Sequence, residues 1–251
     1  MGRPEGSGNV RIDRVMLVGC GGIGSLLAEP LARLLMFHEH GREATLVLVD
    51  GDRFEPHNAA RQLFPAGLAG NKADVTRDRL TVSLGFPVAE SVPSFMDAEG
   101  FAHEMGFARS HRVFILAVDN VATHRVCLDA LDDARGDVTI LRPGNGAGDS
   151  WGLVSVCATV VRRSQWLTAD PRDTHEEIMA PRDVAPRGGC AATIPGEPQR
   201  LASNMLAAAM TVAYVSAILD DRMVPDEWMG ELTGPLAWRG GPAGELVDAG
   251  R

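Results

Sequence analysis

The feature that most constrains the fold is a glycine cluster between a short apolar run and an apolar helical segment. Residues Val15 to Val18 are apolar and too few for a helix, which is typical of a buried strand. The glycines that follow satisfy the pattern G-x-G-x-x-G: Gly19, Gly21, Gly22 and Gly24. Glycine permits a tight turn and lets backbone N–H groups approach a phosphate, which the N-terminus of the next helix also attracts. The sequence therefore predicts a nucleotide-binding unit in an α/β fold.

Polar residues after the second predicted strand narrow the kind of nucleotide. The apolar run Leu46 to Val49 ends at Asp50, and a carboxylate there usually binds a ribose hydroxyl. A polar cluster follows within one loop and one helix start: Asp52, Asn58, Arg61, Gln62 and Lys72. Binding NAD does not require these amide and cationic donors, whereas a site that stabilises a charged α-phosphate does. Lys72 is the single lysine among 24 basic residues, which favours a role for it in the site. The alternative interpretation is that this lysine lies by chance on an exposed helix.

Four motifs in a fixed order resemble one known superfamily. They are GCGGIGS, VDGDRFEPHNAARQ, the lysine-containing AGNKAD and, further along, AVDN. Over roughly residues 12 to 220 the chain resembles the ThiF/MoeB/ubiquitin-activating superfamily. Within it, NAARQLF followed by GNKA most resembles the small ThiF-like proteins of PRTRC gene clusters.

The resemblance implies an ATP-dependent adenylyltransferase. In such enzymes the C-terminal carboxylate of a ubiquitin-like or sulfur-carrier protein attacks the α-phosphate of ATP, and pyrophosphate leaves. Arg61 and Lys72 would neutralise the phosphates. Asn58 and Gln62 would add hydrogen bonds, and Asp50 would bind the ribose. The resemblance also implies a homodimer.

By the same resemblance, Asp119 would bind Mg²⁺. It follows the apolar run Val113 to Val118, at the edge where α/β sheets bind ligands. Its alternative role is the N-cap of the next helix. Asn120 of the AVDN motif and Asp52 join the nucleotide-binding residues, although turns favour aspartate in any case.

The four cysteines are widely spaced and form no C-x-x-C pair, so no zinc site is expected where many relatives have one. Cys190 lies in a long predicted loop, where some relatives form a thioester; the alternative is an unreactive thiol. Cys127 and Cys157 are expected in the core. Cys20, inside the glycine loop, is expected to be structural.

Composition limits the partners. The net charge of −9 and pI near 5.2 argue against a nucleic-acid surface. We expect no membrane span and no signal peptide, and hence a reduced, cytoplasmic protein.

The predicted fold is a single α/β domain over residues 1–251. It is a Rossmann-like, mainly parallel sheet flanked by helices, with an antiparallel extension and a long crossover loop. Residues 1–9 are expected to be disordered, residues 162–199 form the crossover loop, and residues 220–251 are a C-terminal extension with two short strands. Leu201 to Leu219 predicts an apolar helix packed on the sheet.

Two other functions remain open from the sequence. An NAD-dependent oxidoreductase would explain the glycine loop and Asp50, but not Arg61, Lys72 and Asp119. A non-catalytic nucleotide-binding scaffold would not need those three residues either. Relatives such as MoeB supply an arginine to the partner subunit from an extra N-terminal helix. Here Arg3, Arg11 or Arg14 would substitute for it, and nothing in the sequence specifies which.

Overall fold

The computed structural model describes residues 11–64, 69–107, 111–145, 153–179, 201–232, 237–239 and 246–247. Its strands are β1 (Arg14–Val18), β2 (Thr45–Val49), β3 (Ala89–Val92), β4 (His111–Leu116), β5 (Asp137–Asn145), β6 (Leu153–Arg162), β7 (Gln165–Trp166), β8 (Glu227–Glu231), β9 (Ala237–Arg239) and β10 (Leu246–Val247). Its α-helices are α1 (Gly22–Phe37), α2 (Lys72–Leu84), α3 (Ala98–Met105), α4 (Val121–Asp129), α5 (Pro171–Thr174), α6 (Glu176–Met179) and α7 (Leu201–Leu219). Two 3₁₀ turns are η1 (Pro56–Ala60) and η2 (Ala130–Asp133).

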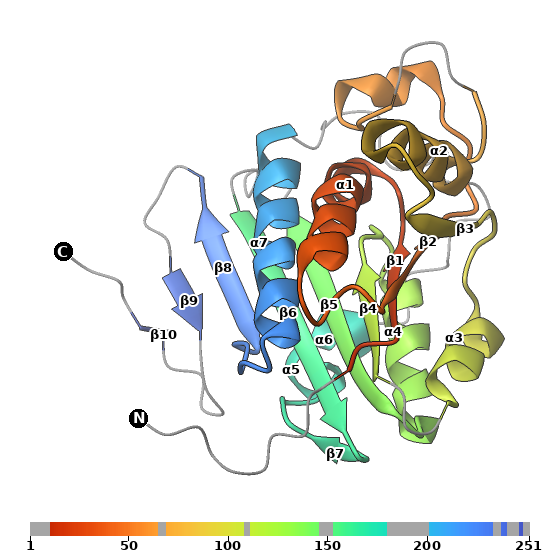
Figure 1. Ribbon diagram of the computed structural model, residues 1–251. Coiled ribbons are helices and arrows are strands. Elements are labelled where there is room, and N and C mark those ends of the chain that lie inside the picture. The colour runs from red at the N-terminus through yellow and green to blue at the C-terminus, as the bar shows by residue number, and fades with distance from the viewer. Residues whose placement is uncertain are drawn as a thin grey trace.

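The strands form one sheet with a parallel half and an antiparallel half (Figure 1). Its order is β10-β9-β8-β6-β5-β4-β1-β2-β3, with β7 beside β6. The pairs from β3 to β5 are parallel, and those from β5 through β6 to β10 are antiparallel. The predicted fold class, including its antiparallel extension, is therefore confirmed.

Strand β5 is longer than the run Val138 to Leu141 that its sequence predicts. Pro143 and Gly144 are turn formers, yet both pair with β6. The pairing of β5 with β4 ends at Leu141. From there β5 has a neighbour on one side only, and a proline is tolerated at such an edge.

Two apolar cores fill the two faces of the sheet. One lies under α1, α2 and α7 and includes Leu27, Leu80 and Val215. The other lies under α3 and α4 and includes Phe101, Phe114 and Leu128. Both faces of the central strands are thus buried, as a parallel sheet requires.

Helix α7 has 19 residues and no charged side chain, so it is long and apolar enough to cross a membrane by length and composition. The prediction of no membrane span rested on the absence of an uncharged apolar stretch of this length, and that premise is wrong. One such helix is weak evidence, because core helices share this composition. Here its buried side, which includes Ala207, Thr211 and Ile218, packs on the sheet beside α1 (Figure 1).

The predicted crossover loop contains secondary structure in its described part. Strand β7 and the four-residue helices α5 and α6 lie between residues 165 and 179. Asp170 caps α5 by accepting a hydrogen bond from the Arg172 N–H at 2.9 Å, and the Arg172 guanidinium pairs with Asp132 at 2.8 Å. Elements this short give no periodic signal in a sequence.

His111, at the start of β4, gives a test of the buried sheet. It is 3% exposed, its Nε2 lies 3.0 Å from Thr139 Oγ1, and burial lowers its pKa to about 4. The pKa of His111 is lower in the folded chain than in the unfolded chain. The stability that depends on neutral His111 is therefore fully present above about pH 6.5 and is lost as pH falls toward about 4, because the unfolded chain binds a proton there first. Between about pH 7 and pH 4, His111 should lower the free energy of unfolding of the wild type by up to ~3 kcal/mol. This part of the decrease should be absent in His111→Gln, as urea denaturation at both pH values measures. His103→Gln, at an exposed position, should not change this fall. Equal pH dependence in both variants would contradict the assignment.

Candidate functional site

Two glycines of the loop between β1 and α1 are required by close backbone packing. Gly19 has φ of +93°, and a Cβ there would lie 2.5 Å from the carbonyl oxygen of Ala117. A Cβ on Gly24 would overlap the carbonyl of Gly19. Because these two positions carry no side chain, the glycine loop, the first turn of α1 and the residues after β4 can pack together at the carboxyl edge of the parallel strands.

Gly21 has a different environment. A Cβ added there would meet only the Gln62 side-chain nitrogen, at 3.9 Å. The loop is therefore open at Gly21, and Gln62 faces this opening. Gln62 is 5% exposed, and its Oε1 has no hydrogen-bond partner among the described residues. An unpaired buried acceptor beside an open glycine is suited to a ligand that donates a hydrogen bond.

Asp50 follows β2 and joins the two loops of the site. Its Oδ2 accepts a hydrogen bond from the Cys20 N–H at 2.7 Å, and its Oδ1 accepts one from the Asp52 N–H at 2.8 Å. Asp50 is 8% exposed, and burial raises its pKa, while the two backbone donors act in the opposite direction. The carboxylate thus fixes the glycine loop relative to the loop after β2.

Lys72, in the first turn of α2, is buried rather than on an exposed helix face. Its Nζ lies 3.0 Å from Asp52 Oδ2, and its side chain is 3% exposed. Asn71 fixes this turn: its Oδ1 caps α2 by accepting from Ala73 N–H at 2.8 Å, and its Nδ2 donates to the Asp50 carbonyl at 2.7 Å. Asn71 was not among the predicted site residues, although an asparagine just before a helix is a recognisable cap.

The turn η1 brings three of the predicted residues to the same edge. Asn58 is 4% exposed, and its Oδ1 accepts from the Glu55 N–H at 3.2 Å, so its acceptor shapes the turn. Gln62 follows and faces Gly21. Arg61 is half-exposed, and its carbonyl oxygen lies 3.5 Å from the Asn204 Nδ2 of α7. Helix α7 therefore contacts the loop that carries Arg61.

Asp119 lies three residues beyond the end of β4 and is exposed. The strand ends at Leu116, earlier than predicted. The Ala117 N–H still donates to the Val18 carbonyl of β1, and the Ala117 carbonyl then packs on Gly19. Asn120 caps α4 by accepting from the Thr123 N–H at 2.8 Å. The N-cap of α4 is thus Asn120, and the alternative role for Asp119 does not apply.

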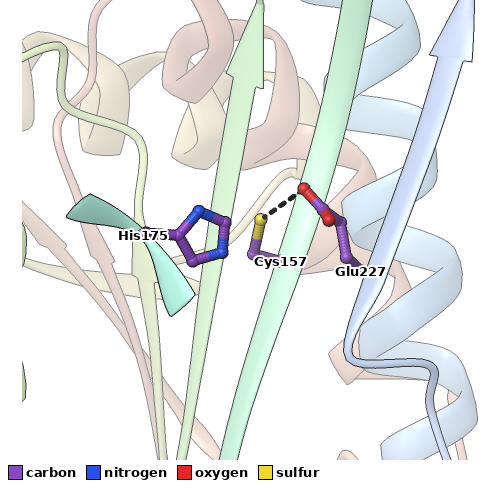
Figure 2. A group of neighbouring side chains, drawn as sticks. All are labelled: Cys157, His175 and Glu227. Atoms are coloured by element: carbon purple, nitrogen blue, oxygen red, sulfur yellow. Dashed lines mark hydrogen bonds between the residues drawn. The ribbon is translucent and has the colours of Figure 1, made fainter. Parts of the chain in front are cut away.

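The cysteines have different environments. Cys20 and Cys127 are fully buried, and burial raises the pKa of both thiols, which agrees with structural roles. Cys157 contacts Glu227 (Figure 2). Cys190 lies outside the described residues, and its thioester role stays a prediction.

The arginines near the start of β1 lie at the opposite end of this strand from the glycine loop. Arg14 pairs with Glu90 at 2.8 Å, and Arg11 pairs with Glu43 at 2.9 Å. Arg3 lies outside the described residues. Neither described arginine therefore reaches the glycine loop of its own subunit.

The family of this chain is given by its match to a family model. The ThiF family model matches residues 3–136, more than half of the chain. The chain belongs to the ThiF family. No curated protein matches the sequence of this ThiF-family chain.

Solved structures share the fold of this ThiF-family protein at low sequence identity. PaaA is 18% identical with a TM-score of 0.60, and the alignment covers 96% of this chain and 65% of PaaA. E. coli MccB with ATP is 17% identical with a TM-score of 0.55, covering 97% of this chain and 65% of MccB. The E. coli tRNA N6-threonylcarbamoyladenosine dehydratase TcdA, in complex with ATP, is 17% identical with a TM-score of 0.54, covering 83% of this chain and 86% of TcdA.

This chain thus spans slightly less than two thirds of the length of PaaA and MccB. At these identities the likeness shows the fold.

The two kinds of glycine environment predict different tolerance to a methyl group. Gly24→Ala should lower the free energy of unfolding by about 1–3 kcal/mol, because the new Cβ meets backbone that cannot rotate away. Gly21→Ala should cost less than about 1 kcal/mol, because the added methyl group enters open space. Urea denaturation of both variants measures the difference. Equal losses would contradict this description of the loop.

Proposed function

We propose that this protein transfers the adenylyl group of ATP to the C-terminal carboxylate of a protein or peptide, with release of pyrophosphate. The observation that carries the proposal is the grouping of an open glycine loop, the buried Asp50, the Gln62 amide and the buried Lys72 at one sheet edge. ATP presents a ribose and three phosphates, and this set offers groups for both.

Asp50 and Gln62 suit the ribose side of the nucleotide. Each Asp50 oxygen accepts one backbone hydrogen bond and has a second lone pair. The Gln62 Oε1 is the buried acceptor noted above. Ribose hydroxyls are donors that match both groups, and the site loses no existing hydrogen bond when they bind.

The phosphates of ATP would be bound by two cations, Lys72 and Arg61, and by the open loop at Gly21. Lys72 donates to Asp52 Oδ2 at 3.0 Å, and its ammonium group carries three donors in all. Arg61 is half-exposed beside Gln62 and brings a second cation. The attacking carboxylate and the α-phosphate are both anions, so these cations lower the cost of bringing them together in line.

Asp119 is the residue that would bind Mg²⁺ in this proposal. Its exposed carboxylate lies just beyond β4, at the carboxyl edge of the parallel strands. Mg²⁺ prefers one or two carboxylates together with phosphate oxygens, and when bound it neutralises phosphate charge.

The partner is proposed to be a ubiquitin-like or sulfur-carrier protein. Structures of MccB include complexes with MccA, which supports a peptide or protein chain as the substrate class. ATP–pyrophosphate exchange tests this directly. A candidate partner with a free C-terminus should support exchange, and the same partner with an amidated C-terminus should not. Binding of NAD without binding of ATP would favour the oxidoreductase instead.

The cationic residues give the first functional prediction. Arg61→Ala and Lys72→Ala should each lower the rate of ATP–pyrophosphate exchange by ~10²-fold or more, the scale of losing one preorganised charge contact. Arg77→Ala is the matched control, because Arg77 lies on α2 but pairs with Asp74 and Asp78 at the surface. Circular dichroism checks folding, since Lys72→Ala removes the ion pair with Asp52, whose side chain is 13% exposed. Activity of the Arg61 and Lys72 variants within twofold of the control would contradict the assignment.

Asp119 gives the second functional prediction. Asp119→Asn should slow exchange and raise the Mg²⁺ concentration required for half-maximal rate. The melting temperature should stay unchanged, because Asn120 supplies the cap of α4. A titration of exchange rate against Mg²⁺ measures the effect. An unaltered magnesium requirement would remove Asp119 from the metal site.

A further inference from the structure

A second cluster of reactive side chains lies in the antiparallel half of the sheet. Cys157 comes from β6, His175 from the link between α5 and α6, and Glu227 from β8 (Figure 2). One ligand atom from each residue lies within 4.8 Å of the other two. Strands β4 and β5 separate β6 from β1, so the cluster is distinct from the glycine-loop site.

We propose that Cys157, His175 and Glu227 bind one Zn²⁺ ion. A thiolate, an imidazole and a carboxylate are the three side-chain types that zinc uses in proteins. The Cys157 Sγ lies 3.5 Å from Glu227 Oε1. Tetrahedral zinc with typical Zn–S and Zn–O bonds separates sulfur from oxygen by roughly 3.5 Å. These two ligands are therefore already spaced for the ion. One His175 ring nitrogen lies within 4.8 Å of both atoms and would supply the third ligand.

The fold itself sets this spacing. Cys157 and Glu227 are direct partners in the antiparallel register of β6 and β8, so their side chains project from the same face of the sheet. His175 reaches this face because the preceding helix α5 is fixed by Arg172, which pairs with Asp170 and Asp132, both at 2.8 Å. The site requires no unusual backbone at the two strand positions.

The contacts favour a metal site over a nucleophilic cysteine. The Cys157 Sγ lies 3.5 Å from the Glu227 carboxylate, so a sulfur ligand and an oxygen ligand lie side by side. This pairing suits a divalent cation, because the charges of a thiolate and a carboxylate together balance that of zinc. Arg142, the partner of Cys157 on β5, is 8% exposed and adds a positive charge that also favours the anionic ligands.

The ligands connect three elements that are far apart in the sequence. They lie on β6, on the link between α5 and α6, and on β8, so a bound ion would fix the α5–α6 segment and β8 to the sheet. Three protein ligands leave a fourth position for water. The expectation of no zinc site rested on the missing C-x-x-C pairs, and this spacing of single residues has no such signature.

The test uses the full chain after treatment with a chelator. We expect one Zn²⁺ per chain in competition with a chromogenic chelator. We also expect a near-ultraviolet thiolate-to-cobalt charge-transfer band when Co²⁺ is added. Cys157→Ser and His175→Ala should weaken zinc binding by on the order of 100-fold or more and remove one metal ligand each. Glu227→Gln keeps the size of the side chain and should weaken it by ~10-fold or more.

Matched controls separate this site from surface binding. His103→Ala removes an exposed histidine, and Cys127→Ser changes a described cysteine that lies outside the cluster; both should retain one equivalent of zinc. The proposal is overturned if the wild-type chain binds no stoichiometric zinc. It is also overturned if Cys157→Ser and His175→Ala bind zinc as tightly as wild type, or if the cobalt complex lacks the thiolate band.

Discussion

The site depends on one buried carboxylate. Asp50 accepts hydrogen bonds from the backbone N–H groups of Cys20 and Asp52, and so joins the loop after β1 to the loop after β2. Burial raises the pKa of Asp50, so its ionised form has an energetic cost that these two donors partly offset. Because the carboxylate orders both loops, the glycine loop and the Asp52–Lys72 pair occupy fixed relative positions before any ligand binds.

Much of this arrangement could be predicted from the sequence. Apolar runs such as Val15 to Val18 gave the parallel strands, and the glycine pattern gave the loop between β1 and α1. Local pattern could not reveal how Asp50 is used, because its donors are backbone groups with no sequence signature. The end of β4 was misplaced for a related reason: Ala117 and Val118 are apolar like a strand, but the Ala117 carbonyl and the Val118 side chain pack on Gly19 of the glycine loop.

The site residues in the parallel half of the sheet could be predicted from the sequence, whereas the cluster in the antiparallel half could not. In the parallel half, site residues lie at strand ends, so order along the chain places them at one edge. In the antiparallel half, the cluster of Cys157, His175 and Glu227 arises from strand register and from two helices of four residues. Register follows from pairing across the sheet, which no single segment encodes. Cys157 was accordingly expected to be an ordinary core residue.

Lys72 shows why the candidate site is more than a structural feature. A buried ion pair contributes little net stability, because desolvation of both charges offsets their attraction. A methionine–leucine pair of similar volume would serve the fold at least as well at the start of α2. The chain uses arginine at every other cationic position except the histidines, yet it has its single lysine here, 3% exposed and 3.0 Å from Asp52. A compact ammonium has three donors and fits a confined space that a planar guanidinium does not. The position of this lysine therefore supports the proposal that Lys72 binds an anionic ligand.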